Sequence, residues 1–366
     1  YQKWPVVRQR ARGGAWNRES CRSGYDDGML FPLRQLSIVA VGLIVLGSAV
    51  GCGQREAPEA AREDWSGPLD QPSRFPSADR LVAIGDLHGD LEAARGALAL
   101  AGAIDVDDRW IGGDLVVVQT GDILDRGDDA MEILDLMDSL GERAREAGGE
   151  IHLLNGNHEL MNVQLDMRYV SVGGYLDFLP GAKPDPEAAT AQDVVDGIAE
   201  RILAIRPGGV VARRFAQRNV IVVVGDTVFV HGGVLPHIVD FGVERLNQET
   251  REWIRGDLRC PPEPLFGSDG PVWSRHYSNE PDEADCRLLE DTLHRMGARR
   301  MVVGHTVQDG GISSACGGLV WRVDVGMADH YGGGLAVLDL SGGGASTVRP
   351  KPVTIARTVT RRSAHE

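Results

Sequence analysis

Short runs of apolar residues recur between residues 81 and 340, and polar or glycine-containing segments separate them. Apolar, largely β-branched runs bounded by turn residues are typical of buried strands. The Gly225-Asp226 pair stands between two such runs and predicts a hairpin. The runs expected to form strands are Leu81–Ile84, Leu115–Gln119, Ile151–Leu154, Val220–Val224, Thr227–Val230, Met301–Val303, Leu319–Val325 and Leu335–Leu340.

Helical periodicity lies between the early runs, in Leu91–Ala101 and in Asp129–Ala147. The first half therefore has the order β-α-β-α-β, and the second half consists mainly of strands and hairpins. This order predicts an α/β protein with two sheets, of which the later is largely antiparallel. Residues 161–218, with a helix-like Ala188–Ile205, interrupt the pattern and are interpreted as an inserted cap that selects substrate.

Five short polar signatures follow predicted strands, and together they carry the chemistry of the chain. Each signature brings glycine next to a residue with an oxygen or nitrogen donor, so that the backbone can approach a bound ion closely. Any one of them alone could be a turn or a helix cap. The signatures are Gly85-Asp-Leu-His-Gly-Asp90, Gly121-Asp-Ile-Leu-Asp-Arg-Gly127, Gly156-Asn-His-Glu159, His231-Gly-Gly233 and Gly304-His-Thr306.

The donor types predict a two-metal hydrolytic site. Carboxylate, amide and imidazole donors without a thiolate suit Mn²⁺, Fe or Zn²⁺. A metal pair can hold a hydroxide for in-line attack on phosphorus and can clamp the phosphoryl oxygens. We expect His158 to be the general acid, Asp125 to orient it, and Arg126 to bind phosphate, with Arg275 completing the clamp. The expected metal ligands are Asp86, His88, Asp122, Asn157, His231 and His305.

As a set, these residues resemble the phosphoprotein phosphatase branch of the calcineurin-like metallophosphoesterases. The stretches 156–170, 271–275 and 323–327 resemble the Shewanella-like protein phosphatases in particular. The resemblance implies a β-sandwich of two mixed sheets flanked by helices. It also implies that Asp86, His88 and Asp122 hold one metal, and that Asp122, Asn157 and His231 hold the other. His305 is expected on either ion.

The composition narrows the partners. The 366 residues carry a formal net charge of −15, which argues against a basic surface for nucleic acid. The five cysteines show no C-x-x-C spacing, so a structural zinc site is not expected. In an oxidising compartment Cys260 and Cys286 could form a disulfide, and unpaired cysteines are the equal alternative.

The N-terminal part is predicted to be a targeting segment. Met29 precedes Arg34, sixteen uncharged residues from Leu36 to Gly51, and Cys52. Sixteen helical residues span about 24 Å, less than a hydrocarbon core of about 30 Å, so a cleaved signal is favoured over a permanent span. Residues 49–52 resemble a lipoprotein cleavage box in which Ala49 replaces the usual Leu, which would attach lipid at Cys52, whereas Ala49 and Gly51 would equally suit an ordinary signal peptidase.

These patterns divide the chain into segments and place its catalytic part outside the cytoplasm, in the cell envelope or periplasm, either tethered to the membrane or released. The predicted segments are a leader (1–28), a signal peptide (29–52), a flexible linker (53–78), the catalytic domain (79–345, with the cap at 161–218) and a disordered tail (346–366).

The leading hypothesis is a phosphomonoesterase acting on phosphorylated protein or peptide. A dinucleoside tetraphosphatase or another small-molecule phosphoesterase shares the metal site and is the first alternative. A catalytically silent envelope binding protein is the second. The choice between phosphoserine or phosphothreonine and phosphotyrosine, the native metals and the oligomeric state stay open.

Overall fold

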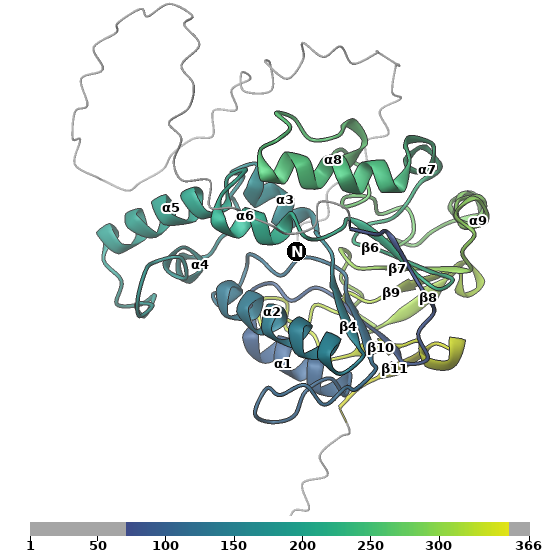
Figure 1. Cartoon of the computed structure of the whole chain (residues 1–366), viewed down its shortest axis with the longest axis horizontal. Helices are drawn as coiled ribbons and strands as arrows, with labels where there is room; N and C mark the ends of the chain where they lie inside the picture. Colours follow the sequence, from purple (N-terminus) through teal and green to yellow (C-terminus); the bar gives the residue numbers. More distant parts are fainter. Residues whose placement is uncertain (1–70, 351–366) are drawn as a thin grey trace, which may run out of the picture. The chain divides into compact units, whose positions relative to one another are not determined.

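The computed structural model describes residues 71–350, which fold around two mixed β-sheets (Figure 1). One sheet has the strand order β11-β10-β2-β3-β4, formed by β2 (Leu81–Ile84), β3 (Val116–Gln119), β4 (Glu150–Leu153), β10 (Val337–Asp339) and β11 (Ser346–Val348). The other has the order β1-β5-β6-β7-β9-β8, formed by β1 (Arg74–Phe75), β5 (Ile221–Val224), β6 (Thr227–Val230), β7 (Arg300–Val303), β8 (Ser313–Ala315) and β9 (Val320–Arg322). The predicted α/β fold with two mixed sheets is confirmed.

The first sheet is built from two βαβ units. Strands β2, β3 and β4 are parallel, and their last residues Ile84, Gln119 and Leu153 pair in register. Parallel neighbours need crossover connections, which are supplied by α1 (Leu91–Leu100) and α2 (Ala130–Glu146). The two helices lie side by side along this sheet (Figure 1). The carboxyl ends of the three strands are therefore level.

The second sheet is more parallel than the sequence indicated. Gly225, at φ +58°, forms the predicted β5–β6 hairpin, but β6 runs parallel to β7, and β7 parallel to β9. The prediction of a largely antiparallel sheet of strands and hairpins is thus wrong. The helical segments between β6 and β7 were missed, and these make the parallel crossover: α7 (Pro236–Phe241), α8 (Val243–Arg255), a 3₁₀ turn η2 (Glu263–Leu265) and α9 (Glu283–Met296).

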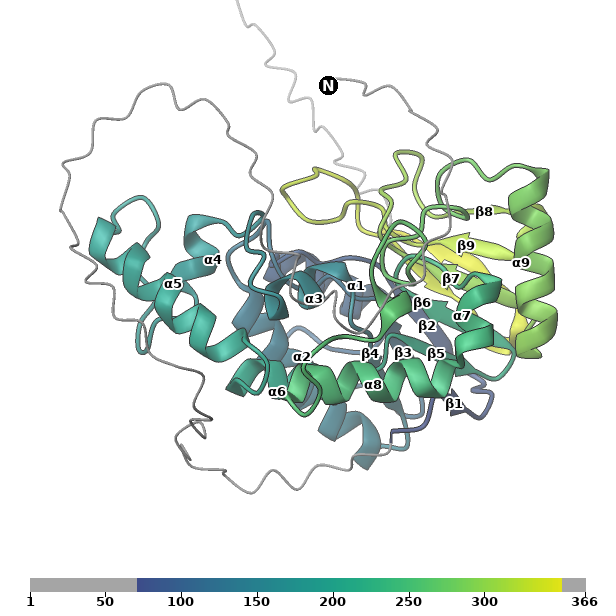
Figure 2. The same cartoon turned by 90° about the horizontal axis from the view of Figure 1, so that it is seen from above.

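The predicted cap contains α4 (Val172–Leu176), α5 (Ala191–Ile205) and α6 (Val210–Phe215), after α3 (Asn157–Val163). Figure 2 shows α4 and α5 extending away from the two sheets. The start of α5 follows from local chemistry, because the Thr190 side chain accepts a hydrogen bond from the backbone N–H of Asp193 and the Asp193 carboxylate accepts one from that of Thr190.

Two predicted segment boundaries need correction. Strand β1 lies inside the predicted linker 53–78, and β11 lies inside the predicted tail 346–366. Each is a short edge strand that gains its order from pairing with β5 or β10, a tertiary effect that local composition does not carry. The predictions for residues 1–28 and 29–52, including Cys52, lie outside the described residues. Within 71–350, none of the helices has the length and apolar character needed to cross a membrane.

Cysteine pairing also differs from the expectation. Cys286, in α9, is bonded to Cys316 with a Cα–Cα distance of 5.2 Å, so the Cys260–Cys286 bridge and the alternative of an unpaired Cys286 are both wrong. The partners are thirty residues apart. Helix α9 leads into β7, and β7 pairs with β9. Because Cys316 and its 3₁₀ turn η3 (Cys316–Gly318) directly precede β9, this pairing brings Cys316 close to α9.

Candidate active site

The predicted site residues meet where strands of both sheets end. Asp86, Asp122 and Asn157 follow β2, β3 and β4, while His231 and His305 follow the parallel pair β6 and β7. Parallel strands place their carboxyl ends at one edge of a sheet, the usual location of ligand sites in α/β folds. All six predicted metal ligands therefore converge, although they span more than two hundred positions in the sequence.

Asp122 lies at the centre of this group. Its Oδ2 atom is 3.8 Å from Nε2 of both His88 and His158, and 3.2 Å from Nε2 of His231. Burial alone would raise the pKa of Asp122, but the imidazoles of His231 and His158 hold that pKa well below its ordinary value. Asp122 is thus an ionised carboxylate shared by two groups of imidazoles, the arrangement expected of a bridging ligand.

Backbone carbonyls fix which nitrogen of two imidazoles faces the site. Nδ1 of His88 donates to the carbonyl of Leu124 at 3.1 Å, and Nδ1 of His231 donates to that of Thr120 at 3.0 Å. In the neutral rings, Nε2 then carries a lone pair. Such a carbonyl partner is the common outer support of a metal-bound histidine.

Around His231, several oxygen and nitrogen atoms that could bind a metal ion lie close together. Its Nε2 lies 2.8 Å from Oδ1 of Asn157 and 3.2 Å from Nδ1 of His305. When Nδ1 of His231 carries the proton given to the Thr120 carbonyl, Nε2 presents a lone pair, as do the oxygens of Asn157 and Asp122, and three such lone pairs at one point match the coordination of a metal ion. Nε2 of His305 is buried and has no hydrogen-bond partner among the described residues. These atoms fit a metal ion, and they place His305 with Asn157 and His231.

The second group contains Asp86 and His88. Nε2 of His88 is 3.9 Å from Oδ2 of Asp86, and both residues are buried. Burial, together with the carboxylates of Asp324 and Asp122, raises the pKa of Asp86 well above its ordinary value. Burial lowers the pKa of His88 to about 4. A bound cation would offset the repulsion among these buried carboxylates, and Mn²⁺, Fe or Zn²⁺ would suit this O/N donor set.

Strained backbone conformations concentrate at the site. His88, Asp122, Asp125, Arg126 and His305 all have φ between +46° and +73°. Non-glycine residues rarely adopt such angles, and each costs on the order of 1–3 kcal/mol. The strain persists because surrounding contacts hold these loops.

A buried carboxylate outside the predicted set supplies much of that support. Glu159 accepts four backbone N–H groups at 2.8–3.2 Å, three from residues 122–124 and one from Gly156. Each of its oxygens accepts two of them, which requires the ionised form, although burial and Asp122 raise the pKa of Glu159. Glu159 thereby joins the second signature to the third.

The predicted general acid and its partner are in contact. Nδ1 of His158 donates to Oδ2 of Asp125 at 2.7 Å, so Nε2 is directed toward Asp122 and the centre of the site. Burial would lower the pKa of His158, but Asp122 and Asp125 raise it above its ordinary value. A protonated imidazole held by a carboxylate is suited to donate a proton.

The two predicted arginines have different surroundings. The Arg126 guanidinium lies 4.0 Å from the ring centroid of Tyr169, and its buried Nε has no partner among the described residues. Arg275 is exposed and donates to the carbonyl of His305 and to the hydroxyl of Thr306. Both cations are available for an anionic ligand.

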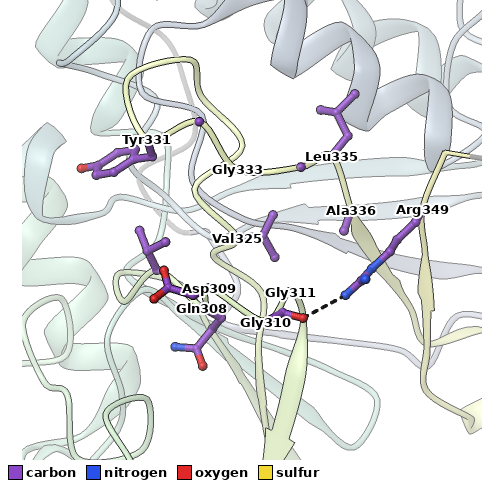
Figure 3. A pocket seen from close by; sticks show the side chains of 13 residues that line it. Gln308, Asp309, Gly310, Gly311, Val325, Tyr331, Gly333, Leu335, Ala336 and Arg349 are labelled. Carbon is purple, nitrogen blue, oxygen red and sulfur yellow. Dashed lines mark hydrogen bonds between the residues drawn. The ribbon is translucent and has the colours of Figure 1, made fainter. Parts of the chain in front are cut away.

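A cavity of about 300 Å³ lies between the loops 307–311 and 331–336 (Figure 3). At one edge lies Tyr331, whose ring centroid is 5.2 Å from that of His88. Arg349 lies on the opposite side and donates to the carbonyl of Gly310. Tyr331 therefore connects the cavity to the candidate metal cluster.

A model of the calcineurin-like phosphoesterase family matches residues 79–309. The chain belongs to that family. Over 293 residues it is 43% identical to Shewanella-like protein phosphatase 2 of Arabidopsis thaliana, covering 72% of the chain and 75% of that relative. Shewanella-like protein phosphatase 1 of Plasmodium berghei is 28% identical, with 69% of each protein covered.

Solved structures agree with this assignment. The cold-active protein-tyrosine phosphatase of a psychrophilic Shewanella species superposes with a TM-score of 0.61 and 26% identity, covering 78% of this chain and 85% of that one. The predicted resemblance to the Shewanella-like phosphatases is therefore confirmed. This calcineurin-like phosphoesterase is a phosphatase, a hydrolase of phosphoesters.

The sequence reasoning missed several buried polar residues of this phosphatase site. Glu159 lies in the third signature, where no role was predicted for it, and Asp324 was not among the predicted site residues. Asp324 is buried beside Asp86, and burial raises its pKa to about 6. Asn162 and Arg201 were not singled out, because neither belongs to a signature and only folding brings them to Asp125. His152, outside these contacts, lies against Phe75 with ring centroids 4.1 Å apart.

Proposed function

We propose that this phosphatase removes phosphate from phosphorylated protein side chains with two metal ions. The observation that carries the proposal is the convergence of carboxylate, amide and imidazole groups around Asp122, next to the hydrogen-bonded His158–Asp125 pair. Phosphoprotein substrates are inferred from the relatives named as protein phosphatases. The predicted location outside the cytoplasm is part of the proposal and rests on residues 29–52 alone.

The residues divide into two metal-binding groups. Asp86, His88 and Asp122 would hold one ion, and Asp122, Asn157, His231 and His305 would hold the other. Bound there, Mn²⁺, Fe or Zn²⁺ ions would neutralise phosphoryl oxygens and lower the pKa of water.

The side chains of this chain perform the remaining work. Arg126 and Arg275 bind the non-bridging phosphate oxygens through their planar guanidinium groups. Water adds to phosphorus and gives up a proton, while the bond to the leaving oxygen breaks. His158 transfers its Nε2 proton to that oxygen, and Asp125 keeps the ring in the productive tautomer.

The proposal is tested with the full chain on peptides that carry phosphoserine, phosphothreonine or phosphotyrosine and on diadenosine tetraphosphate, with metal content measured on the same sample. We expect phosphopeptide hydrolysis that is lost on chelation and restored by Mn²⁺. The His158→Asn variant should lose about 10²–10⁴-fold in kcat, whereas His152→Asn, a control in β4 whose ring packs against Phe75, should not. A metal-loaded wild type that hydrolyses none of the phosphopeptides contradicts the proposal, and preference for the dinucleotide supports the small-molecule alternative.

A further inference from the structure

Arg201 is a fully buried cation that belongs to the cap but contacts the catalytic pair. It lies on α5 with its side chain 1% exposed, and its NH2 group donates to Oδ1 of Asp125 at 3.0 Å. The guanidinium also donates to Oδ1 of Asn162 and to the carbonyl of Gly174. Burying a cation costs several kcal/mol unless it is paired and hydrogen-bonded. The burial of the Arg201 charge is thus offset mainly by its ion pair with Asp125.

The contacts leave Asp125 no freedom to turn. Its Oδ2 accepts from His158, and its Oδ1 accepts from Arg201 and from the Asn162 amide. Asn162 also donates to the carbonyl of His158. Asn162 and Arg201 therefore hold the carboxylate through Oδ1, while Oδ2 holds the imidazole of His158.

The position of Arg201 depends on how the cap packs. Gly197, one helical turn earlier, lets α5 approach α4 so closely that a Cβ atom there would lie 2.6 Å from the carbonyl oxygen of Tyr175. The guanidinium is also covered by Phe178, with the ring centroid 4.6 Å away. The cap and the catalytic pair are thus one packed unit.

We propose that Arg201 is a positioning residue for proton transfer to the leaving group. This inference rests on the proposed function. Arg201 and Asn162 keep the Asp125 carboxylate aligned with Nδ1 of His158, so that Nε2 meets the ester oxygen as its bond to phosphorus breaks. The proton of Nε2 goes to that oxygen, water supplies the new oxygen on phosphorus, and Asp125 stays ionised. A correctly seated cap is therefore required for protonation of the leaving group.

The test compares two aryl phosphates that differ in their need for an acid. Phenolate is a poor leaving group and requires a proton, whereas dinitrophenolate departs without one. For Arg201→Met in the metal-loaded full chain, we expect kcat on phenyl phosphate to fall about 10- to 100-fold and kcat on dinitrophenyl phosphate to fall less than about threefold. Arg201→Lys keeps the charge without the planar fork and should recover part of the loss.

Two further variants separate positioning from loss of structure. Asp125→Asn should show the same dependence on leaving group, since it breaks the same pair. Ile205→Ala removes buried apolar volume from α5 without a hydrogen bond to the pair, and should affect both substrates equally. Equal losses on both substrates for a folded Arg201→Met variant overturn the inference. If the wild type hydrolyses neither substrate, the proposed function fails instead.

Discussion

The Glu159→Gln variant probes how the two signature loops are held together. The substitution preserves shape and volume, but an amide has only one acceptor oxygen. The carboxylate accepts four buried N–H groups, two on each oxygen. In the variant, the amide nitrogen faces two N–H donors and leaves both unsatisfied.

The magnitude follows from those two donors. Each orphaned buried N–H costs about 1–3 kcal/mol, which gives about 2–6 kcal/mol. Neutralising Glu159 also removes the free-energy cost of burying its charge and its repulsion from Asp122. These are the two effects that raise the pKa of Glu159. The offset places the expected loss of unfolding free energy in the lower half of that range, about 2–4 kcal/mol.

Urea denaturation followed by tryptophan fluorescence measures this loss as a lower midpoint with an unchanged slope. Glu146→Gln, on the exposed surface at the end of α2, is the matched control and should change stability by less than about 0.5 kcal/mol. Because the loops carry Asp122 and Asn157, we also expect the variant to bind less metal at equilibrium. Wild-type stability and metal content in Glu159→Gln would refute the reasoning.

Three further predictions concern the cap, the disulfide and a close backbone contact. Burial and a contact with Glu132 raise the pKa of Asp177 to about 7. Folding therefore favours the protonated form of Asp177. As the pH rises from 4 to 7, the contribution of Asp177 to the unfolding free energy falls by up to about 1.4 kcal/mol per pH unit. Asp177→Asn should remove that slope in unfolding free energies measured across this range, and an unchanged slope contradicts the shift. Replacing both Cys286 and Cys316 by serine opens a thirty-residue loop and should cost about 3–4 kcal/mol in denaturant unfolding under non-reducing conditions, and reductant should destabilise the wild type more than the variant. Gly121→Ala should lower the thermal midpoint and metal content together, because a Cβ there would lie 2.5 Å from the nitrogen of Gly156 at φ +101°; an unchanged midpoint shows that the loop can shift.

Local pattern was sufficient for much of the fold. The runs at 81–84 and 227–230 coincide with β2 and β6, and the helix predicted at 188–205 is α5 at 191–205. Strands buried at every position, as β2 and β6 are, appear as continuous apolar runs. The amphipathic α8 and α9 were missed, and with them the parallel pairing of β6 and β7.

The sequence by itself determined the candidate donor set, since the residue types and their places after predicted strands were sufficient to predict six candidate ligands and the His158–Asp125 pair and to indicate the family. Tertiary structure decided what lies behind those residues. His305 joined Asn157 and His231 because β6 and β7 are parallel, and Arg201 reached Asp125 from seventy-six positions away. Short motifs encode a ligand and its local turn, whereas the contacts that orient the ligand come from whichever distant side chains the packed core brings close.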